Sequence, residues 1–479
     1  MKNIGVSLLK LFLLLSSIYG FSQDKSGDLE KAIDNLFSSY TTETPGVAVA
    51  IVKDTTIVFK KGYGQATLEY DIPITPKTIF HVASVSKQFT AFAIYLLEKK
   101  GKLSFEDDVR TYLPELPDYH KIIRIKHLLS HTSGLRDQWA LLTLAGWSLE
   151  DVITTEQILG LAYNQKGLNF ESGTAFGYCN TGYTILAKIV EKISGQSFAV
   201  FTKQNIFQPL KMGNTQFYDD YQKVVENRAY SYEIKNGNYI KKELNYSNVG
   251  PTSLFTTVED LAKWANNFDN PIVGDIDLFK EFNKVSNLEN GNAVIYRQTK
   301  KDTLYHAKGQ LIWKYKDHKL ISHGGHDAGF RAFLARFPED DWKIITLSND
   351  EHYNILKNGF QIADLFLGKR QAENYLEKPL QQPKAEVRPK FTSNFKEFKG
   401  LYASNELQTS YEIDIENNML VLKHHRLGNM KLTQTGEADF IGNNYFNFQL
   451  TFLKEAEKVI GFSISNFGVK NLLVNKISD

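Results

Sequence analysis

The sequence contains a single cysteine, Cys179, among its 479 residues. One cysteine cannot form an intramolecular disulfide, and it excludes every zinc or iron–sulfur site that needs several cysteines. Net charge is also nearly absent, because 56 Lys and Arg residues face 54 Asp and Glu residues. Strong electrostatic binding to nucleic acid therefore has no support, and we expect no nucleic-acid partner.

Several motifs that mark common enzyme classes are missing as well. The chain has no Gly-x-Ser-x-Gly elbow, no P-loop, no His-Glu-x-x-His pair and no Gly-x-Gly-x-x-Gly turn. These absences argue against the usual motif-marked hydrolases, nucleotide-binding proteins and zinc enzymes. At roughly 100–200 residues per domain, the length still allows about two to four domains with a buried core.

Residues 1–22 have the layout of a secretory signal peptide. Lys2 and Lys10 precede the apolar run 11–19, and small residues follow that run. We predict cleavage near Ser22 and an exported protein, periplasmic or secreted, with no membrane span after signal removal. The alternative is an uncleaved amphipathic N-terminal helix, but the sequence turns abruptly polar after the run.

Composition divides the rest of the chain into two domains and a linker. An alternating helix and strand pattern fills residues 23–368, beginning with a hairpin over Val47–Phe59 that we expect to be buried on both faces. Residues 369–390 are polar and contain three prolines, which indicates a stiff linker. Alternating apolar residues and turn signals in residues 391–479, among them a turn at Asn417-Asn418, predict a small all-β domain. A ligand pocket inside that domain stays open as an alternative.

The first candidate for chemistry is Ser84, which is followed three residues later by Lys87. Ser-x-x-Lys occurs three more times, so the spacing alone carries little weight. Only this copy begins a strongly periodic apolar helix, which we expect to end at Gly101. Residues three apart on a helix share a face, so the Lys87 amine can reach the Ser84 hydroxyl and help to remove its proton. The alternative is a solvated pair at an ordinary helix start.

The second candidate is Tyr178-Cys179-Asn180, just before a predicted helix that ends at Gly195. A tyrosine with a pKa of roughly 10 is useful as a base at neutral pH only if an ammonium such as Lys87 favours the phenolate. Tyr-x-Asn occurs twice more in the chain, so its surroundings must decide.

The third candidate is His323-Gly324-Gly325-His326, followed by a predicted hairpin over Ala332–Leu347. The glycines would let a substrate lie against the backbone. Two histidines separated by two glycines, without an evident third ligand, make a metal site the weaker reading, and we expect neither a metal nor a cofactor. A glycine-rich strand end is the structural alternative, more so for His326 than for His323.

Taken together and in this order, the three motifs resemble the serine β-lactamase and penicillin-binding-protein superfamily. The similar branch holds class C β-lactamases, D-aminopeptidases, DD-carboxypeptidases and esterases. Phe80–Lys87 also looks like the nucleophile segment of that family, and Leu128–Leu135 looks like one of its loops. The resemblance covers residues 30–367, and the all-β tail is similar to the lipocalin-like barrels of some members. It implies an α+β fold, an antiparallel sheet flanked by helices plus a helical subdomain, followed by a small all-β barrel.

Carried over residue by residue, the resemblance implies that Ser84 is the acylated nucleophile. Lys87 and Tyr178 would be the proton-transfer partners, and Asn180 would position the substrate. Which of Lys87 and Tyr178 is the acylation base stays open, because that assignment is disputed within the superfamily.

The resemblance also implies substrate contacts from His323, Gly325 and His326, with an oxyanion hole formed by the N–H groups of Ser84 and His326. The sequence departs from β-lactamases here, because His323 stands where they have the lysine of Lys-Thr-Gly. An unperturbed histidine is mostly neutral at pH 7, so dedicated recognition of penicillin carboxylates is not expected.

The sequence thus predicts an exported serine hydrolase that cleaves amide or ester bonds through an acyl-enzyme on Ser84. Its partner would be a small molecule or a peptide, with D-amino-acid peptides derived from peptidoglycan first, short esters second and β-lactams last. One alternative is a β-lactamase proper. Another is a sensor that binds penicillin or peptidoglycan and acylates slowly or not at all; retention of Lys87 and Tyr178 argues against it.

Overall fold

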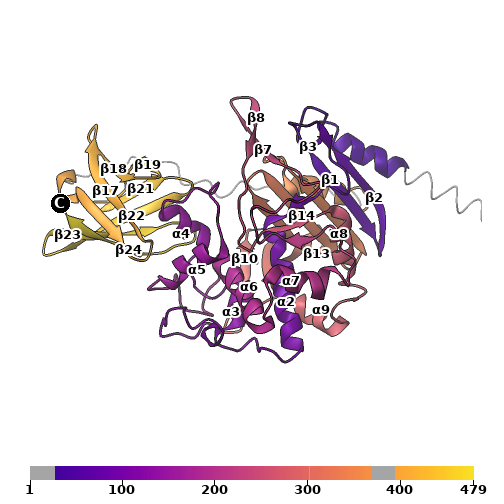
Figure 1. The fold of residues 1–479 in the computed structure, drawn as a ribbon, viewed down its shortest axis with the longest axis horizontal. Helices are drawn as coiled ribbons and strands as arrows, with labels where there is room; N and C mark the ends of the chain where they lie inside the picture. The colour runs from indigo at the N-terminus through magenta and orange to yellow at the C-terminus, as the bar shows by residue number, and fades with distance from the viewer. Residues whose placement is uncertain (1–26, 301, 368–393, 479) are drawn as a thin grey trace, which may run out of the picture.

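The computed structural model describes residues 27–300, 302–367 and 394–478. The predicted signal peptide, residues 1–22, and the predicted linker, residues 369–390, lie outside the described residues. Figure 1 shows a large body of sheet and helices beside a smaller β-sheet body formed by the C-terminal residues. The expected α+β architecture with a barrel-like C-terminal sheet is confirmed.

The large body is built on an eight-stranded antiparallel sheet. In spatial order its strands are β10 (Ile295–Gln298), β11 (Thr303–Ala307), β12 (Gln310–Tyr315), β13 (His318–Asp327), β14 (Phe330–Phe337), β15 (Trp342–Ser348), β1 (Val47–Lys53) and β2 (Thr56–Tyr63). The apolar residues of β1 are completely buried, as the sequence predicts. β2 is half exposed, so the expectation of a hairpin buried on both faces is wrong for this strand. It forms the edge of the sheet and carries Lys60 and Lys61.

Helices cover both faces of this sheet. The helix over residues 27–36 and α10 pack on one face, where alternate residues of β1 such as Val49 meet Ile33 and Ile362. The opposite face meets α8 and the helical subdomain around α2 (Figure 1). The helices are α2 (Ser86–Lys99), α3 (Ile125–Leu129), α4 (Gln138–Leu144), α5 (Thr155–Tyr163), α6 (Asn180–Ser194), α7 (Phe198–Thr202), α8 (Val258–Asn266), α9 (Ile276–Phe282) and α10 (Ile355–Ala363).

The central helix, α2, is buried around almost its whole circumference. A helix surrounded by protein needs apolar or small side chains on all sides, and α2 has them, apart from the buried polar residues Lys87, Gln88 and Thr90. Its predicted end is confirmed, since Gly101 follows it with a positive φ of 64°. Its predicted start differs slightly, because Ser84 lies in a 3₁₀ turn, η1 (Ala83–Val85), that precedes the helix.

Short strands and turns complete the large body. They are β3 (Gln65–Thr67), β4 (Ile72–Pro73), β5 (Phe80–His81), β6 (Gln216–Phe217), the β7–β8 hairpin (Ser231–Lys235 and Asn238–Lys242), β9 (Leu254–Thr256), η2 (Val109–Thr111) and η3 (Lys203–Phe207). β5 pairs with β9, which also pairs with β6, so the segment that enters η1 is held on a three-stranded sheet.

The C-terminal residues form a nine-stranded antiparallel sheet that curls into a nearly closed barrel, called here the C-terminal barrel. After η4 (Phe395–Phe398) its strands are β16 (Gly400–Ser404), β17 (Thr409–Glu416), β18 (Met419–His424), β19 (Gly428–Lys431), β20 (Thr433–Gln434), β21 (Asp439–Asn443), β22 (Asn447–Glu455), β23 (Lys458–Ser465) and β24 (Leu472–Ser478). The predicted turn between β17 and β18 is confirmed: Asn417 and Asn418 both have positive φ, as a two-residue hairpin turn requires.

The C-terminal barrel and the large body share one hydrophobic core. The barrel lies beside α4 and α5 (Figure 1), and the Tyr411 hydroxyl donates a hydrogen bond to the Leu144 carbonyl at the end of α4. A buried ion pair reinforces the contact, with Arg136 Nη1 2.7 Å from Glu406 Oε2. Glu406 Oε2 also accepts a hydrogen bond from the Lys166 N–H at 2.7 Å. The C-terminal barrel therefore packs directly against the large body.

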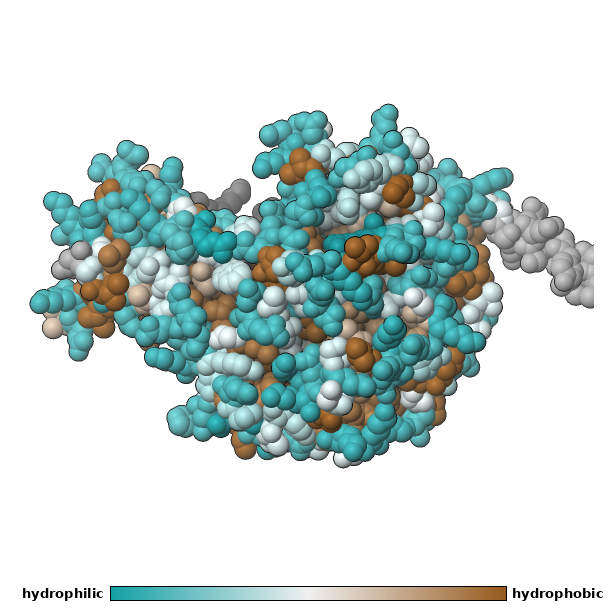
Figure 2. All heavy atoms as spheres, in the orientation of Figure 1, coloured by the Kyte–Doolittle hydropathy of each residue, from teal (hydrophilic) through white to brown (hydrophobic). Residues whose placement is uncertain are grey.

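The face of the molecule shown in Figure 2 is mainly hydrophilic, and apolar residues are scattered over it. Apolar residues spread in this way are normal for a folded protein and identify no interaction surface. Within the described residues, every helix is too short or too polar to cross a membrane.

We expect Glu406→Ala to lower the free energy of unfolding by about 3–5 kcal/mol, because it leaves the charge of the buried Arg136 guanidinium without its carboxylate partner. Chemical denaturation measures this loss. The matched control is Asp151→Ala, which breaks a second ion pair between the two bodies, with Arg426, in a more exposed place. It should cost about 0–1 kcal/mol. Equal losses in the two variants would contradict the importance of the buried pair.

Candidate active site

Ser84 lies at a strained turn that points it into a cleft. Ala83, just before it, has a φ of +46°, a left-handed conformation that costs a non-glycine residue about 1–3 kcal/mol. β13 approaches this turn to backbone contact, since a Cβ on Gly325 would lie 2.2 Å from the Val82 carbonyl oxygen. The open side of Gly325 thus faces η1, and any side chain there would push β13 away from Ser84.

Lys87 is fully buried beneath Ser84. Its Nζ lies 3.0 Å from Ser84 Oγ, 2.8 Å from Asn180 Oδ1 and 2.9 Å from the Pro251 carbonyl oxygen. Burial lowers the pKa of Lys87 to about 7, against the opposing charges of Asp327 and Asp137. As an ammonium, Lys87 can donate to all three oxygens; as a neutral amine, it keeps two N–H groups for the two carbonyl oxygens and has a lone pair left for the serine hydroxyl.

Tyr178 approaches Ser84 from the other side. Its hydroxyl donates a hydrogen bond to Ser84 Oγ at 3.0 Å, and Lys87 Nζ lies 4.9 Å from its ring centroid. Burial nevertheless raises the pKa of Tyr178 well above its ordinary value. Desolvation is the largest cause, and a neutral Lys87 would supply no charge to favour a phenolate, so Tyr178 stays protonated.

Asn180 is held by a carboxylate that sequence reasoning missed. Asp137 Oδ2 accepts hydrogen bonds from the N–H and the Nδ2 of Asn180, at 2.7 and 2.8 Å. Its Oδ1 accepts the Trp139 N–H at 2.9 Å and so caps α4. Asp137 thereby turns the carbonyl oxygen of Asn180 towards Lys87. An acidic residue before an apolar run signals a helix start in the sequence, but nothing there links it to Asn180.

Two histidines of the third motif lie on β13 and differ in exposure. His323 is buried, its Nδ1 donates to the Gly324 carbonyl at 2.6 Å, and burial lowers its pKa to about 3. The ring is therefore neutral and offers no cation to a substrate carboxylate. His326 is exposed on the rim of the cleft around Ser84. Among the described side chains, no three His, Cys, Asp or Glu residues are gathered to hold a metal ion.

The end of β13 has a free edge beside Ser84. β12 pairs only with the first part of β13, from His318 to Ser322, whereas β14 pairs along the other side as far as Asp327. The outer edge of residues 323–327 therefore has no β12 partner. An extended substrate can lie along such an edge and hydrogen-bond to the backbone.

Ser84 lies where two cavities meet. One, of about 470 Å³, is also lined by Asn180 and Asp327 and reaches the C-terminal barrel. The other, of about 660 Å³, runs past His323 and Trp313. Tyr178 and His326 line both cavities, so a substrate with its scissile bond at Ser84 has room on each side.

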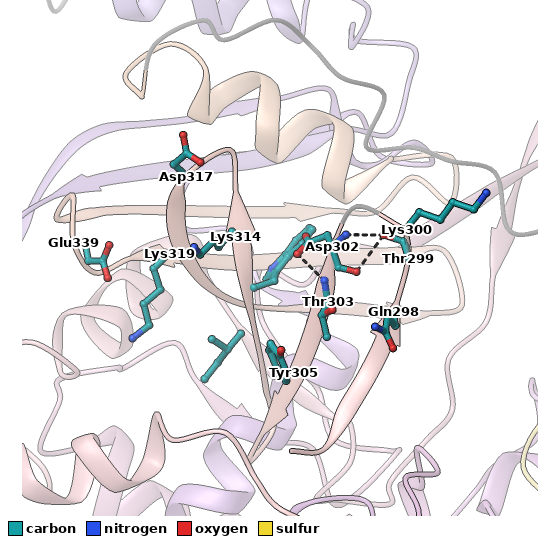
Figure 3. Close-up of a pocket in the computed structure, with 12 residues that line it drawn as sticks. Gln298, Thr299, Lys300, Asp302, Thr303, Tyr305, Lys314, Asp317, Lys319 and Glu339 are labelled. Carbon is teal, nitrogen blue, oxygen red and sulfur yellow. Dashed lines mark hydrogen bonds between the residues drawn. The ribbon is translucent and has the colours of Figure 1, made fainter. Parts of the chain in front are cut away.

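A further hollow of about 620 Å³ lies on the outer strands β10 to β13, and Ser84 does not line it. Figure 3 shows the charged side chains around it, among them Lys300, Asp317 and Glu339, pointing in different directions. They do not converge on one place where a ligand group would sit. The candidate site is therefore the cleft at Ser84.

Comparison with known proteins is consistent with this geometry. The sequence model of the family described as "Beta-lactamase" matches residues 33–360. The chain is 28% identical over 405 residues to penicillin-binding protein 4* of Bacillus subtilis, across 80% of this chain and 85% of that protein. It is also 28% identical to a D-aminopeptidase of Brucella anthropi over 308 residues, 64% of this chain but only 56% of that enzyme. The solved structure of an octameric penicillin-binding protein homologue from Pyrococcus abyssi superposes with a TM-score of 0.63, at 21% identity, over 94% of this chain and 99% of that chain.

We expect Asp137→Asn to misplace Asn180 and Lys87. Both oxygens of Asp137 accept hydrogen bonds from N–H groups, and the new amide NH₂ would face one of these donors without an acceptor. The variant should lose about 1–3 kcal/mol of stability and about 10²-fold in kcat/KM for p-nitrophenyl acetate. Thermal melts and ester kinetics measure the two effects.

The control for this variant is Asp275→Asn, which changes the N-cap of α9. It should leave kcat/KM unchanged. If Asp137→Asn retains the wild-type kcat/KM as well, Asp137 does not position the site.

Proposed function

The chain belongs to the β-lactamase family, and on that premise we propose that it is an exported serine hydrolase that forms an acyl-enzyme on Ser84. One observation carries this proposal: Lys87 Nζ and Tyr178 Oη both lie 3.0 Å from Ser84 Oγ, and burial lowers the pKa of Lys87 to about 7 while it raises the pKa of Tyr178. This is the arrangement of a nucleophile with a base and an acid in hydrogen-bond reach.

The protonation states favour Lys87 as the acylation base. Its lone pair takes the Ser84 proton while Oγ bonds to the substrate carbonyl carbon. When the tetrahedral intermediate collapses, the bond to the leaving group breaks and the leaving group takes the Tyr178 proton. The Lys87 ammonium then returns a proton to Tyr178. Water then attacks the carbonyl carbon of the resulting ester. Lys87 and Tyr178 again transfer the protons, and the Ser84 hydroxyl is released.

The backbone supplies the groups for the developing oxyanion. We assign the N–H groups of Ser84 and His326 to this role, because β13 is packed against η1 through Gly325. One such donor is typically worth about 10²–10³ in rate. Asn180 is assigned to the substrate as well as to Lys87, since it lines the cleft and is fixed by Asp137.

The proposed substrates are amides of D-amino acids, including peptides derived from peptidoglycan, followed by short esters. The D-aminopeptidase among the relatives supports this order. So does the neutral state of His323, which gives a penicillin carboxylate no cation in that place. We therefore rank β-lactams last.

Export is also part of the proposal. It rests on the signal-like pattern of residues 1–22 and agrees with the hydrolysis of cell-wall peptides, which lie outside the cytoplasm. Mass spectrometry of the protein recovered from the producing cells would identify the mature N-terminus.

We expect Ser84→Ala to remove all labelling by a fluorophosphonate, seen as intact mass, and to lower p-nitrophenyl acetate turnover by about 10³-fold or more. The fold should be unchanged, because Ser84 is only partly buried and its hydroxyl is small. Labelling of the variant at the wild-type rate would refute the nucleophile. A stable wild-type adduct without turnover would instead favour the slowly acylating sensor.

We expect kcat/KM to fall about tenfold per pH unit below pH 7, because Lys87 must be neutral to act as base and its pKa is about 7. Above pH 7 the amine is mostly deprotonated, so kcat/KM should become independent of pH. A pH profile of ester hydrolysis between pH 5 and 9 measures this. A flat profile across pH 7 would contradict Lys87 as the base.

A further inference from the structure

Two loops of the C-terminal barrel reach into the cleft of Ser84. Tyr445 and Phe446 sit in the turn between β21 and β22, and Phe467 sits in the loop between β23 and β24. All three line the 470 Å³ cavity that also contains Ser84. Phe467 is 61% exposed, although it is a large apolar side chain, so it stands at the mouth of the cavity rather than in the barrel core.

Both loops are fixed to the large body. The Gly468 carbonyl accepts hydrogen bonds from the Asp137 N–H and from Asn169 Nδ2, each at 2.9 Å. A Cβ on Gly468 would lie 2.6 Å from the Cβ of Asp137, so the loop needs glycine at this contact. In the other loop, the Tyr445 hydroxyl donates to Ser148 Oγ at 2.8 Å. The loop tips are therefore held at defined positions in the cavity wall.

The wall that they complete is aromatic. The rings of Phe446 and Phe467 meet edge to face with their centroids 4.5 Å apart. From the large body, Trp139 and Tyr246 line the same cavity and pack on each other at 4.8 Å. Such a wall suits a bulky apolar group, and its ring faces also attract a cation.

A carboxylate lies in the same cavity. The Asp327 side chain is 16% exposed there, and Thr252 donates a hydrogen bond to it. Burial raises the pKa of Asp327 to about 6, so it is charged above that pH. Within the described residues its one ion-pair contact is the His81 ring, at 3.8 Å, and burial holds that ring neutral by lowering its pKa to about 3. Arg331 lines the same cavity, and its charge and that of Lys87 act to lower the pKa of Asp327, but among the described residues neither side chain forms an ion pair with this carboxylate.

We propose that this cavity is the acyl-group subsite, and that it selects an acyl group carrying a free ammonium beside an aromatic or large aliphatic side chain. Asp327 binds the ammonium, and Phe446 and Phe467 of the C-terminal barrel contact the side chain. The substrate lies along the free edge of β13, with its leaving group towards His323. This inference rests on the proposed function, since it places the acyl group on Ser84.

The test compares kcat/KM for the p-nitroanilides of D-phenylalanine, D-alanine and N-acetyl-D-phenylalanine. Wild-type protein should prefer the free amine over the acetylated one and phenylalanine over alanine. Phe467→Ala should lower the phenylalanine-to-alanine ratio about tenfold, and Asp327→Asn should lower the free-to-acetylated ratio about tenfold or more. Each ratio is measured within one variant, so a partial loss of folded protein cancels.

Leu473→Ala is the matched control, because Leu473 is exposed on β24 of the same barrel and does not line the cavity. Both ratios should stay at wild-type values in it. Fluorophosphonate labelling of Ser84 is measured in parallel, and its absence in wild-type protein would defeat the proposed function itself.

Two results would overturn the subsite assignment while labelling persists. One is unchanged ratios in Phe467→Ala and Asp327→Asn, and the other is no hydrolysis of any amino-acyl anilide by wild-type protein.

Discussion

The buried amine of Lys87 is the group around which the site is organised. A lysine without exposed surface loses its hydration, so the protein favours the neutral form and obtains a base at a pH where free lysine is an acid. That state is useful only if the lone pair points at Ser84. The carbonyl oxygens of Asn180 and Pro251 occupy the two N–H groups and leave the lone pair for the serine. Asp137 serves the same end, because it fixes the amide of Asn180.

The features that could be predicted from the sequence are those that depend on residues close together in the chain. The three-residue spacing of Ser84 and Lys87, the stop at Gly101 and the Asn417-Asn418 turn follow from local backbone geometry. Other features depend on the order of the strands in the sheet. β2 is half exposed because it is an edge strand, and its apolar residues do not reveal that position. The protonation state of Tyr178 was open for the same reason, since burial is a property of the assembled core.

The two barrel loops were beyond prediction on similar grounds. Alternating apolar residues identify strands and the face that fills a core, but they do not say where the tips of the turns lie. That position follows from the docking of the C-terminal barrel through Arg136 and Glu406, residues far apart in the chain. The same docking brings Gly468 against Asp137. One set of contacts therefore both stabilises the joined core and shapes the cleft.

The long separation of these contacts orders the events of biosynthesis. Arg136 also donates a hydrogen bond to the carbonyl of Lys470, 334 residues further along the chain. Ser84 and Lys87 are translated well before the loop that supports Asp137, which lies between β23 and β24. Closing so long a loop comes late in folding. A nascent chain that ends before this loop therefore lacks a finished catalytic centre, and turnover begins only after β23 and β24 have folded.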